Sequence, residues 1–471
     1  MVATTDTAQI DAPLSHGFGP VSLTLLGVGT VVGAGIFVMT GQAAALYAGP
    51  AVTLSFLIAG LVCALPALCY AELAAMMPIA GSAYRFAREA FGERVGWFVG
   101  WALVAEYLFA MGAVAIGWSA YMQDVIGTAG WHLPAALATS PVAMSEYRFT
   151  LTGAVINLPA VLLVTAMASV LLIGTRESAR FNGLIVAIKL SAVVLFIVFG
   201  LAYAHARNWV PFLPDRVVGP GGVEAYGLTG VLQGAGVVFF AFLGFDVLAT
   251  AAQDTRNPQR NIPIGLMATL GISIFLYIAV AAAMIGLVDF HTLNTAAPLT
   301  AALGAAGSGL AWLKSYVGIC ATIGLGTGVF SALFALSRLL FSLARDGLLP
   351  GAMRTPRTAV VVAAGFGIAI AGFLPINLLG QLISTGTLIA FAMVCAALIA
   401  LRLQQPHRHR PFRIPFWRVT PVLGIAASLF VLIGMGIPAL GRIIAWQAVG
   451  LALYAFIAWR QRMAAAKRPV L

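Results

Sequence analysis

The chain consists of successive apolar runs of about 20 residues joined by short polar loops. A run of about 20 apolar residues is the length that an α-helix needs to cross the hydrocarbon core of a bilayer. Of the 471 residues, 61% are hydrophobic and 9% are charged, whereas soluble domains are about half apolar and about a quarter charged. The sequence therefore predicts an all-α integral membrane protein with no water-soluble domain left over.

We predict twelve transmembrane helices. An even number of spans places both termini on one side of the membrane. Of the 26 Lys and Arg residues, 19 fall in loops and the tail on that side and five on the other, and this excess marks the cytoplasmic side. We therefore expect both termini in the cytoplasm and the protein in the plasma membrane, a bacterial inner membrane. The predicted spans are 21–47, 51–76, 95–123, 151–174, 182–204, 226–252, 261–288, 311–344, 358–374, 378–401, 418–437 and 442–460.

The spans are predicted to form two sets of five. Residues 1–20 would be a cytoplasmic N-terminal tail, 21–205 a first five-helix repeat and 226–403 a second. Residues 404–471 would hold a cytoplasmic loop, accessory helices 11 and 12 and a short C-terminal tail. Because five is odd, the second set enters the membrane from the opposite face, as in an inverted-topology repeat with its site between broken helices. Spacing and helix breaks support this repeat; alignment of the two halves does not.

The first span carries small residues at mid-depth, namely Gly33, Ala34 and Gly35. Such residues let the backbone leave helical geometry and approach a ligand closely. The half-helix that begins there would offer N–H groups and a positive dipole end, which suit a carboxylate. We include Val31, just before the break, among the substrate-binding candidates.

The sixth span is predicted to break around residues 240–244. The half-helix that ends there would present the carbonyls of Phe240, Ala241 and Leu243 to an ammonium group, and Phe240 and Phe242 would either cap the ligand or serve ordinary packing. N–H groups on one wall and C=O groups on the other match an α-amino acid. Glycines also allow close helix packing, but breaks in both spans favour a site.

Further motifs follow in order along the chain. They are G-x-x-x-G-x-GIF at 29–37, YAELA at 70–74, FFAFLGFD at 239–246, NPQRNIPIG at 257–265 and ARDGLLP at 344–350. Together they resemble the amino acid–polyamine–organocation (APC) superfamily, and within it the bacterial members of the cationic amino acid transporter family. The resemblance covers about residues 18–405. It implies a five-plus-five inverted-repeat, leucine-transporter-like fold with helices 1 and 6 broken, and amino acid transport.

Lys189 lies in the middle of the fifth span, where an ammonium group costs at least a few kcal/mol unless something relieves it. The resemblance implies that it takes the place of a sodium ion and ties the first span to spans five and eight. Proton loss near neutral pH would release that tie, which makes Lys189 the candidate for proton coupling. A permanently charged structural lysine is the alternative.

Two carboxylates are supporting candidates. The resemblance implies that Glu106 lies near the first helix and the substrate cavity. There it would hold a proton, accept hydrogen bonds from backbone freed by the break or be purely structural; binding a cationic substrate side chain is the less favoured alternative. Asp246 is expected to cap amides of the second half-helix. Glu72 and Arg338 are expected in a cytoplasmic ion-pair and gate region. Ala34 stands where many relatives have Ser or Thr, so one hydroxyl near the carboxylate is absent.

We therefore predict a secondary active amino acid transporter working by alternating access. Proton-coupled symport of small or medium neutral L-amino acids is the first hypothesis. The alternatives are a transporter of arginine, lysine or ornithine, an uncoupled exchanger and a membrane amino acid sensor. The expected partners are the amino acid, a proton and the lipid bilayer, not nucleic acid. No enzyme, metal site or cofactor is expected, because the four cysteines fall inside apolar runs and no catalytic cluster appears.

Overall fold

The computed structural model describes residues 19–33, 35–77, 82–145, 148–173, 179–218, 224–245, 248 and 255–466, and these are mostly helical. The α-helices are Pro20–Val31 (α1), Thr40–Ala43 (α2), Val52–Met76 (α3), Ser82–Phe91 (α4), Glu93–Thr128 (α5), Ala135–Ala138 (α6), Leu158–Ile173 (α7), Ala179–Ala202 (α8), Gly227–Val238 (α9), Pro258–Leu287 (α11), Pro298–Ala305 (α12), Ala311–Arg345 (α13), Pro356–Phe373 (α14), Ile376–Gln404 (α15), Thr420–Gly434 (α16) and Ile437–Ala466 (α17). Strands β1 (Val142–Ser145) and β2 (Arg148–Leu151) form one antiparallel hairpin, and β3 (Val217–Val218) and β4 (Glu224–Ala225) another.

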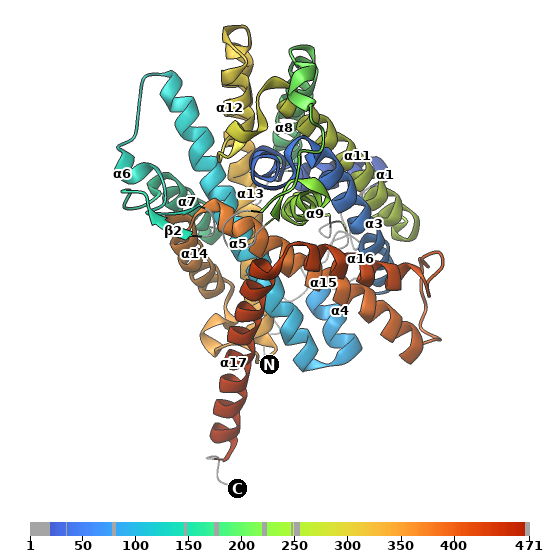
Figure 1. The fold of residues 1–471 in the computed structure, drawn as a ribbon. Helices are drawn as coiled ribbons and strands as arrows, with labels where there is room; N and C mark the ends of the chain where they lie inside the picture. Colours follow the sequence, from blue (N-terminus) through green and yellow to red (C-terminus); the bar gives the residue numbers. More distant parts are fainter. Residues whose placement is uncertain are drawn as a thin grey trace.

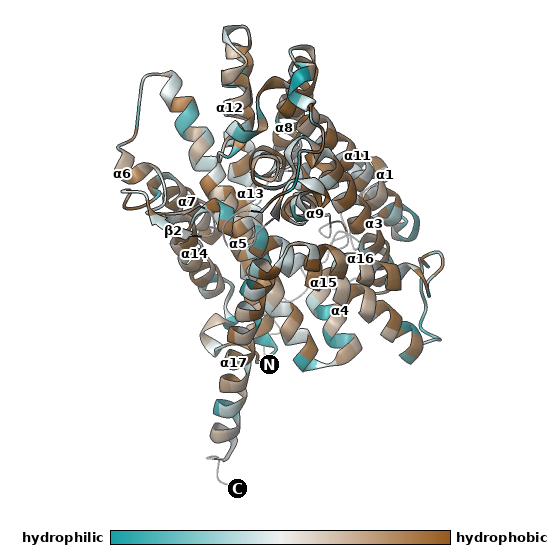
Figure 2. Cartoon of the chain, in the orientation of Figure 1, coloured by the Kyte–Doolittle hydropathy of each residue, from teal (hydrophilic) through white to brown (hydrophobic). Residues whose placement is uncertain are grey.

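Eight helical segments of the described chain are long and apolar enough to cross a membrane. Three shorter apolar helices accompany them, and the first of the eight, Pro20–Met76, itself contains an interruption. Every predicted span overlaps one of these helices, although the total of twelve stays a prediction. Apolar residues cover most of the helices, and hydrophilic residues gather towards the helix ends (Figure 2). This distribution is the one expected of helices that cross a lipid bilayer.

Two long helices, α5 and α13, cross the middle of the bundle and pack on each other (Figure 1). Helices α7 and α14 pair on one flank, and α1, α3 and α11 on the opposite flank. Small residues allow these close approaches, as in membrane helix packing generally. A Cβ atom added at Gly112 of α5 would lie 2.4 Å from Ile370 of α14.

The last helix, α17, docks on α5 through two tryptophans. The Trp101 indole N–H donates to the Trp446 carbonyl at 2.8 Å, and the Trp446 indole N–H donates to the Trp101 carbonyl at 3.0 Å. Their rings stack at 5.0 Å between centroids. Gly450 leaves room for this stack, since a Cβ there would lie 2.2 Å from the Trp101 ring. The C-terminal helix is therefore fixed to the first half of the chain.

Candidate functional site

The first membrane helix is interrupted at mid-length. Helix α1 ends at Val31, and the chain resumes helical geometry as a π-helical turn, η1, at Gly35–Met39. Between them the Gly33 carbonyl accepts hydrogen bonds from both the Ile36 and the Phe37 N–H groups, at 3.2 Å each. One carbonyl thus serves two amides that a continuous helix would pair separately, so the backbone leaves the regular pattern here.

The second interruption lies in the helix that begins with α9. Helix α9 gives way to a 3₁₀ turn, η5, at Phe239–Phe242, and Leu243 then adopts extended geometry with φ −59° and ψ 139°. Gly244 follows with φ +105°, a backbone conformation that glycine reaches without steric cost. The glycine is therefore needed for the chain to turn away from the helix axis at this point.

The two interruptions touch each other. A Cβ atom at Gly35 would lie 2.2 Å from the Ala241 Cα atom and 2.3 Å from its Cβ atom. The Tyr277 hydroxyl of α11 lies 2.7 Å from the Val31 carbonyl and 2.7 Å from the Ala241 carbonyl. Its single proton is shared between these two acceptors. Sequence reasoning missed Tyr277; the available signal was one tyrosine within the apolar seventh span.

The carbonyls predicted to be bare at the second break are already hydrogen-bonded. The Phe240 carbonyl accepts from the Leu243 N–H at 3.0 Å, and the Ala241 carbonyl accepts from Tyr277. The prediction of unpaired carbonyls at these two positions is therefore wrong for this conformation. A buried backbone group without a partner is costly, so neighbouring donors bind these oxygens. The Phe240 N–H in turn donates to the Ser384 hydroxyl of α15 at 3.2 Å, a second residue that the sequence did not indicate.

The two candidate aromatic side chains differ in their surroundings. Phe242 is almost fully buried, and its ring contacts the Tyr277 ring in an edge-on arrangement at 5.2 Å. That contact favours the packing alternative for Phe242. Phe240 is also buried, with an exposed fraction of 5%, and stays a candidate for contact with a ligand.

Lys189 of α8 connects three helices. Its ammonium donates to the Gly29 carbonyl of α1 at 2.8 Å, and its aliphatic stem fills the space beside Gly324 of α13, where a Cβ would lie 2.4 Å from Cδ. Carbonyls in the last turn of a helix lack an intrahelical partner, which explains why the lysine binds there. The expected links from span five to spans one and eight are present, whereas the coupling role stays a prediction.

The remaining candidates lie at the edge of this arrangement or outside the described residues. Glu106 of α5 is buried, with its Cβ atom 3.5 Å from the Cβ position of Gly386 on α15. The Thr30 hydroxyl donates to the Gly27 carbonyl at 2.8 Å and approaches the Gly244 carbonyl at 3.3 Å, so it links the two breaks. Ala34 and Asp246 are outside the described residues.

Glu72 is the centre of a buried ion-pair network, as the sequence predicted. Arg402 donates to both of its carboxylate oxygens, at 2.8 and 2.5 Å, and the Ile414 N–H donates at 2.8 Å. Arg410 lies 3.6 Å away. Arg338 does not belong to this network: its guanidinium lies over the Phe334 ring at 5.0 Å. The expected place of Arg338 in a cytoplasmic gate region stays a prediction.

A second charged group joins α4 to the end of α13. Asp346 accepts a hydrogen bond from the Tyr84 hydroxyl at 2.6 Å, pairs with Arg88 and lies 3.7 Å from Arg85. Burial alone would raise the pKa of Asp346, but the hydrogen bonds from Tyr84 and Arg88 and the arginine charges outweigh it, so the pKa lies below its ordinary value. A cavity of about 250 Å³ lies beside this group, lined by Met77, Arg85, Phe86, Arg88 and Glu89.

At the other end of the interrupted helices the packing is close. The Tyr226 N–H donates to the Tyr47 carbonyl at 2.6 Å, and a Cβ at Gly230 would lie 2.2 Å from that same oxygen. The Tyr47 hydroxyl accepts from the Gln381 amide at 2.9 Å, and Arg442 of α17 bonds to the Gln381 carbonyl oxygen. Four separate helical segments therefore meet around Tyr47.

The sequence is similar to those of known membrane transporters. A family model described as "Amino acid permease" matches residues 18–458. The methylthioribose transporter of Bacillus subtilis (strain 168) is 38% identical over 449 residues, which cover 94% of this chain and 93% of the relative. The branched-chain amino acid permease BcaP of the same organism is 36% identical, with 94% and 92% covered. The vacuolar cationic amino acid transporter 4 of Arabidopsis thaliana is 34% identical over 400 residues, covering 83% of this chain and 64% of the relative.

Proposed function

The chain belongs to the amino acid permease family of the APC superfamily, and on that premise we propose that it is a secondary active amino acid transporter working by alternating access. The proposal includes twelve spans, two inverted repeats of five and cytoplasmic termini. Permeases of this family are multi-pass membrane proteins and not enzymes, so the function lies in a binding site that opens alternately to each side.

The observation that carries the proposal is the meeting of two helix interruptions at Gly35 and Ala241. Irregular backbone at membrane depth is tolerated only where it is buried in protein or lines a cavity, and in transporters such breaks form the substrate site. Among the described residues, no atom lies closer than 4.0 Å to a Cβ built at Gly33. That open space beside the amides of η1 is where we place the substrate carboxylate.

Neutral amino acids are the substrates that the surroundings support best. Val31, Phe240 and Ala241 are apolar and line the two breaks. The relative BcaP is named for branched-chain amino acids. The plant relatives are named for cationic amino acids, which keeps arginine, lysine and ornithine as the alternative. Because one relative is named for methylthioribose, that thioether sugar belongs in the same competition assay.

We propose proton coupling through Lys189. Its bond to the Gly29 carbonyl holds α1 beside α8 and α13, and loss of its proton would weaken that bond, since a charged donor makes the stronger hydrogen bond. The close packing around Tyr47 and the cavity beside α4 support a conformation that is sealed at one end and open at the other.

Uptake by proteoliposomes tests the function. We expect accumulation of labelled leucine against its gradient, stimulated by an inward proton gradient and inhibited by isoleucine and valine. Counterflow without stimulation by the proton gradient would instead indicate an exchanger. Inhibition by arginine alone, or by methylthioribose alone, would overturn the neutral assignment, and binding of amino acids without any uptake would indicate a sensor.

A further inference from the structure

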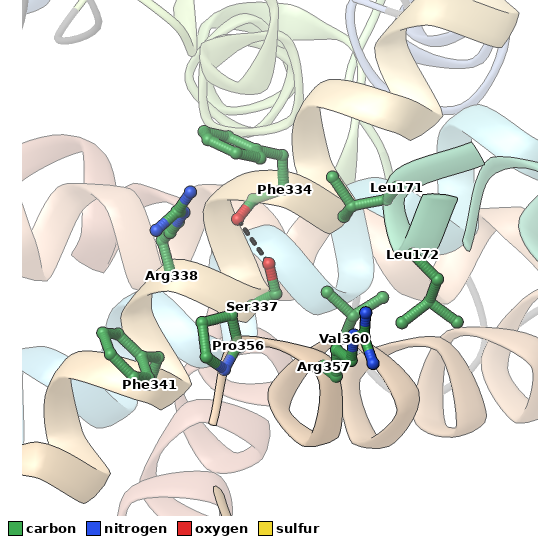
Figure 3. Close-up of a pocket in the computed structure, with 9 residues that line it drawn as sticks. All are labelled: Leu171, Leu172, Phe334, Ser337, Arg338, Phe341, Pro356, Arg357 and Val360. Carbon is green, nitrogen blue, oxygen red and sulfur yellow. Dashed lines mark hydrogen bonds between the residues drawn. The ribbon is translucent and has the colours of Figure 1, made fainter. Parts of the chain in front are cut away.

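A second candidate site lies on the outer surface of the bundle, where α7, α13 and α14 meet (Figure 3). A cavity of about 90 Å³ opens there. Its walls combine two arginines with apolar side chains, and they include Leu171, Leu172, Phe334, Arg338, Arg357 and Val360. This cavity is separate from the two helix interruptions, so a ligand could bind there whether or not the proposed transport function is correct.

The two arginines provide positive charge at the membrane edge. Arg338 extends from α13 over the Phe334 ring, and Arg357 lies in the first turn of α14, on the other side of Pro356 in the view of Figure 3. Both side chains are exposed. Among the described residues neither forms an ion pair with a carboxylate within 4 Å. The N-terminal end of α14 adds its positive dipole to the same place.

The surface around the arginines is apolar and exposed. Leu172 has an exposed fraction of 36%, Ile173 of 78%, Phe334 of 42% and Val361 of 58%. In a membrane protein such side chains face acyl chains. Arg338 lies seven residues before the end of α13 at Arg345, about 10 Å along the helix axis, within reach of the headgroup layer for a long side chain that extends towards it.

We propose that this groove binds an anionic phospholipid. The guanidinium groups would hold the headgroup phosphate, since a guanidinium matches phosphate geometry and charge, and an acyl chain would lie over Leu172 and Phe334. Basic pockets between transmembrane helices near the cytoplasmic face bind such headgroups, and this end of α13 lies on the side with the excess of positive charge.

The experiment uses the full-length protein in detergent with added lipid. Native mass spectrometry would measure the bound fraction of phosphatidylglycerol and of phosphatidylcholine with the same acyl chains. We expect the wild type to retain phosphatidylglycerol preferentially, and Arg338→Gln and Arg357→Gln each to lower its affinity about fivefold. Glycerol phosphate, which lacks acyl chains, should not compete, because it cannot make the apolar contacts with Leu172 and Phe334.

Arg345→Gln is the matched control, because Arg345 is on the same helix, is exposed and lies over Phe341 at 5.7 Å as Arg338 lies over Phe334. This control should bind phosphatidylglycerol as the wild type does. Equal binding of the two lipids by the wild type would overturn the proposal without reference to any variant. Full phosphatidylglycerol binding by the Arg338→Gln, Arg357→Gln double variant would overturn it as well, and effective competition by glycerol phosphate would assign the site to a soluble phosphate.

Discussion

Gly35 lies directly against Ala241, so the interruption after α1 contacts the one after α9 and leaves no space for a side chain at position 35. The atoms in the way belong partly to the backbone of Ala241, which cannot rotate aside. The two glycines of the first break therefore have different roles. Gly35 allows contact between the breaks, whereas Gly33 borders open space.

This difference predicts that Gly35→Ala lowers the free energy of unfolding by about 1–3 kcal/mol, the usual cost of overpacking. Thermal unfolding of the purified protein in detergent would measure it. Gly33→Ala is the matched control and should unfold within a degree or two of the wild type, because its Cβ would meet no atom of the described part of the chain closer than 4.0 Å. Equal destabilisation by both variants would contradict the assigned contact.

Replacement of Lys189 by Met should abolish the stimulation of uptake by a proton gradient while leaving a folded protein. The methionine keeps the packing beside Gly324 but cannot donate to the Gly29 carbonyl. Proteoliposome uptake at two external pH values would show the loss. Lys314→Met, which removes a lysine from the loop-proximal end of α13, should retain the wild-type response. Proton-driven accumulation by the Lys189 variant would disprove the coupling role.

Tyr277→Phe should reduce substrate affinity about tenfold, because the hydroxyl that joins the Val31 and Ala241 carbonyls is lost and a net hydrogen bond contributes about 1 kcal/mol or somewhat more. Competition binding with labelled leucine would measure the change. Tyr203→Phe, at an exposed position past the end of α8, serves as the control. An unchanged affinity in Tyr277→Phe would separate this bridge from the substrate site.

Glu72→Gln should destabilise the protein by about 3–5 kcal/mol, because it leaves the charges of Arg402 and Arg410 buried without compensation. The expected readout is a large fall in the melting temperature. Glu89→Gln offers the comparison, since Glu89 and Arg408 form an exposed pair at 3.4 Å that contributes about 0–1 kcal/mol. A similar melting temperature for both variants would show that the buried network adds no stability.

Asp346→Asn should lower stability in a pH-dependent way. The pKa of Asp346 is depressed in the folded protein, so its contribution is fully present above the ordinary carboxyl pKa of about 4 and is lost as the pH falls through the lowered value. The melting temperatures of wild type and variant should therefore differ at pH 7, begin to converge below about pH 4 and meet only once the pH is below the lowered pKa. A difference that is constant over this range would exclude ionisation of Asp346 as the cause.

Sequence alone determined the features that depend on a few neighbouring residues. The length and apolarity of each run predicted the helices, and glycines such as Gly35 and Gly244 marked the places where the backbone departs from them. The resemblance to the APC superfamily implied that Lys189 lies beside spans one and eight, and its contacts with Gly29 and Gly324 agree with that. The pairing of Glu72 with nearby arginines was expected because a buried carboxylate needs a charged partner. The helix positions and the backbone breaks depend on residues that are close together in the sequence.

Tertiary structure alone decided which groups meet. Tyr277 binds the Val31 carbonyl across 246 residues of chain, and its hydrogen bond to the Ala241 carbonyl occupies a group that was expected to be bare. The guanidinium of Arg338 lies over Phe334 of its own helix, apart from the ion-pair network around Glu72. Helical periodicity places a side chain on a face of its own helix, but the orientation of that face depends on packing against distant helices, which no local pattern encodes.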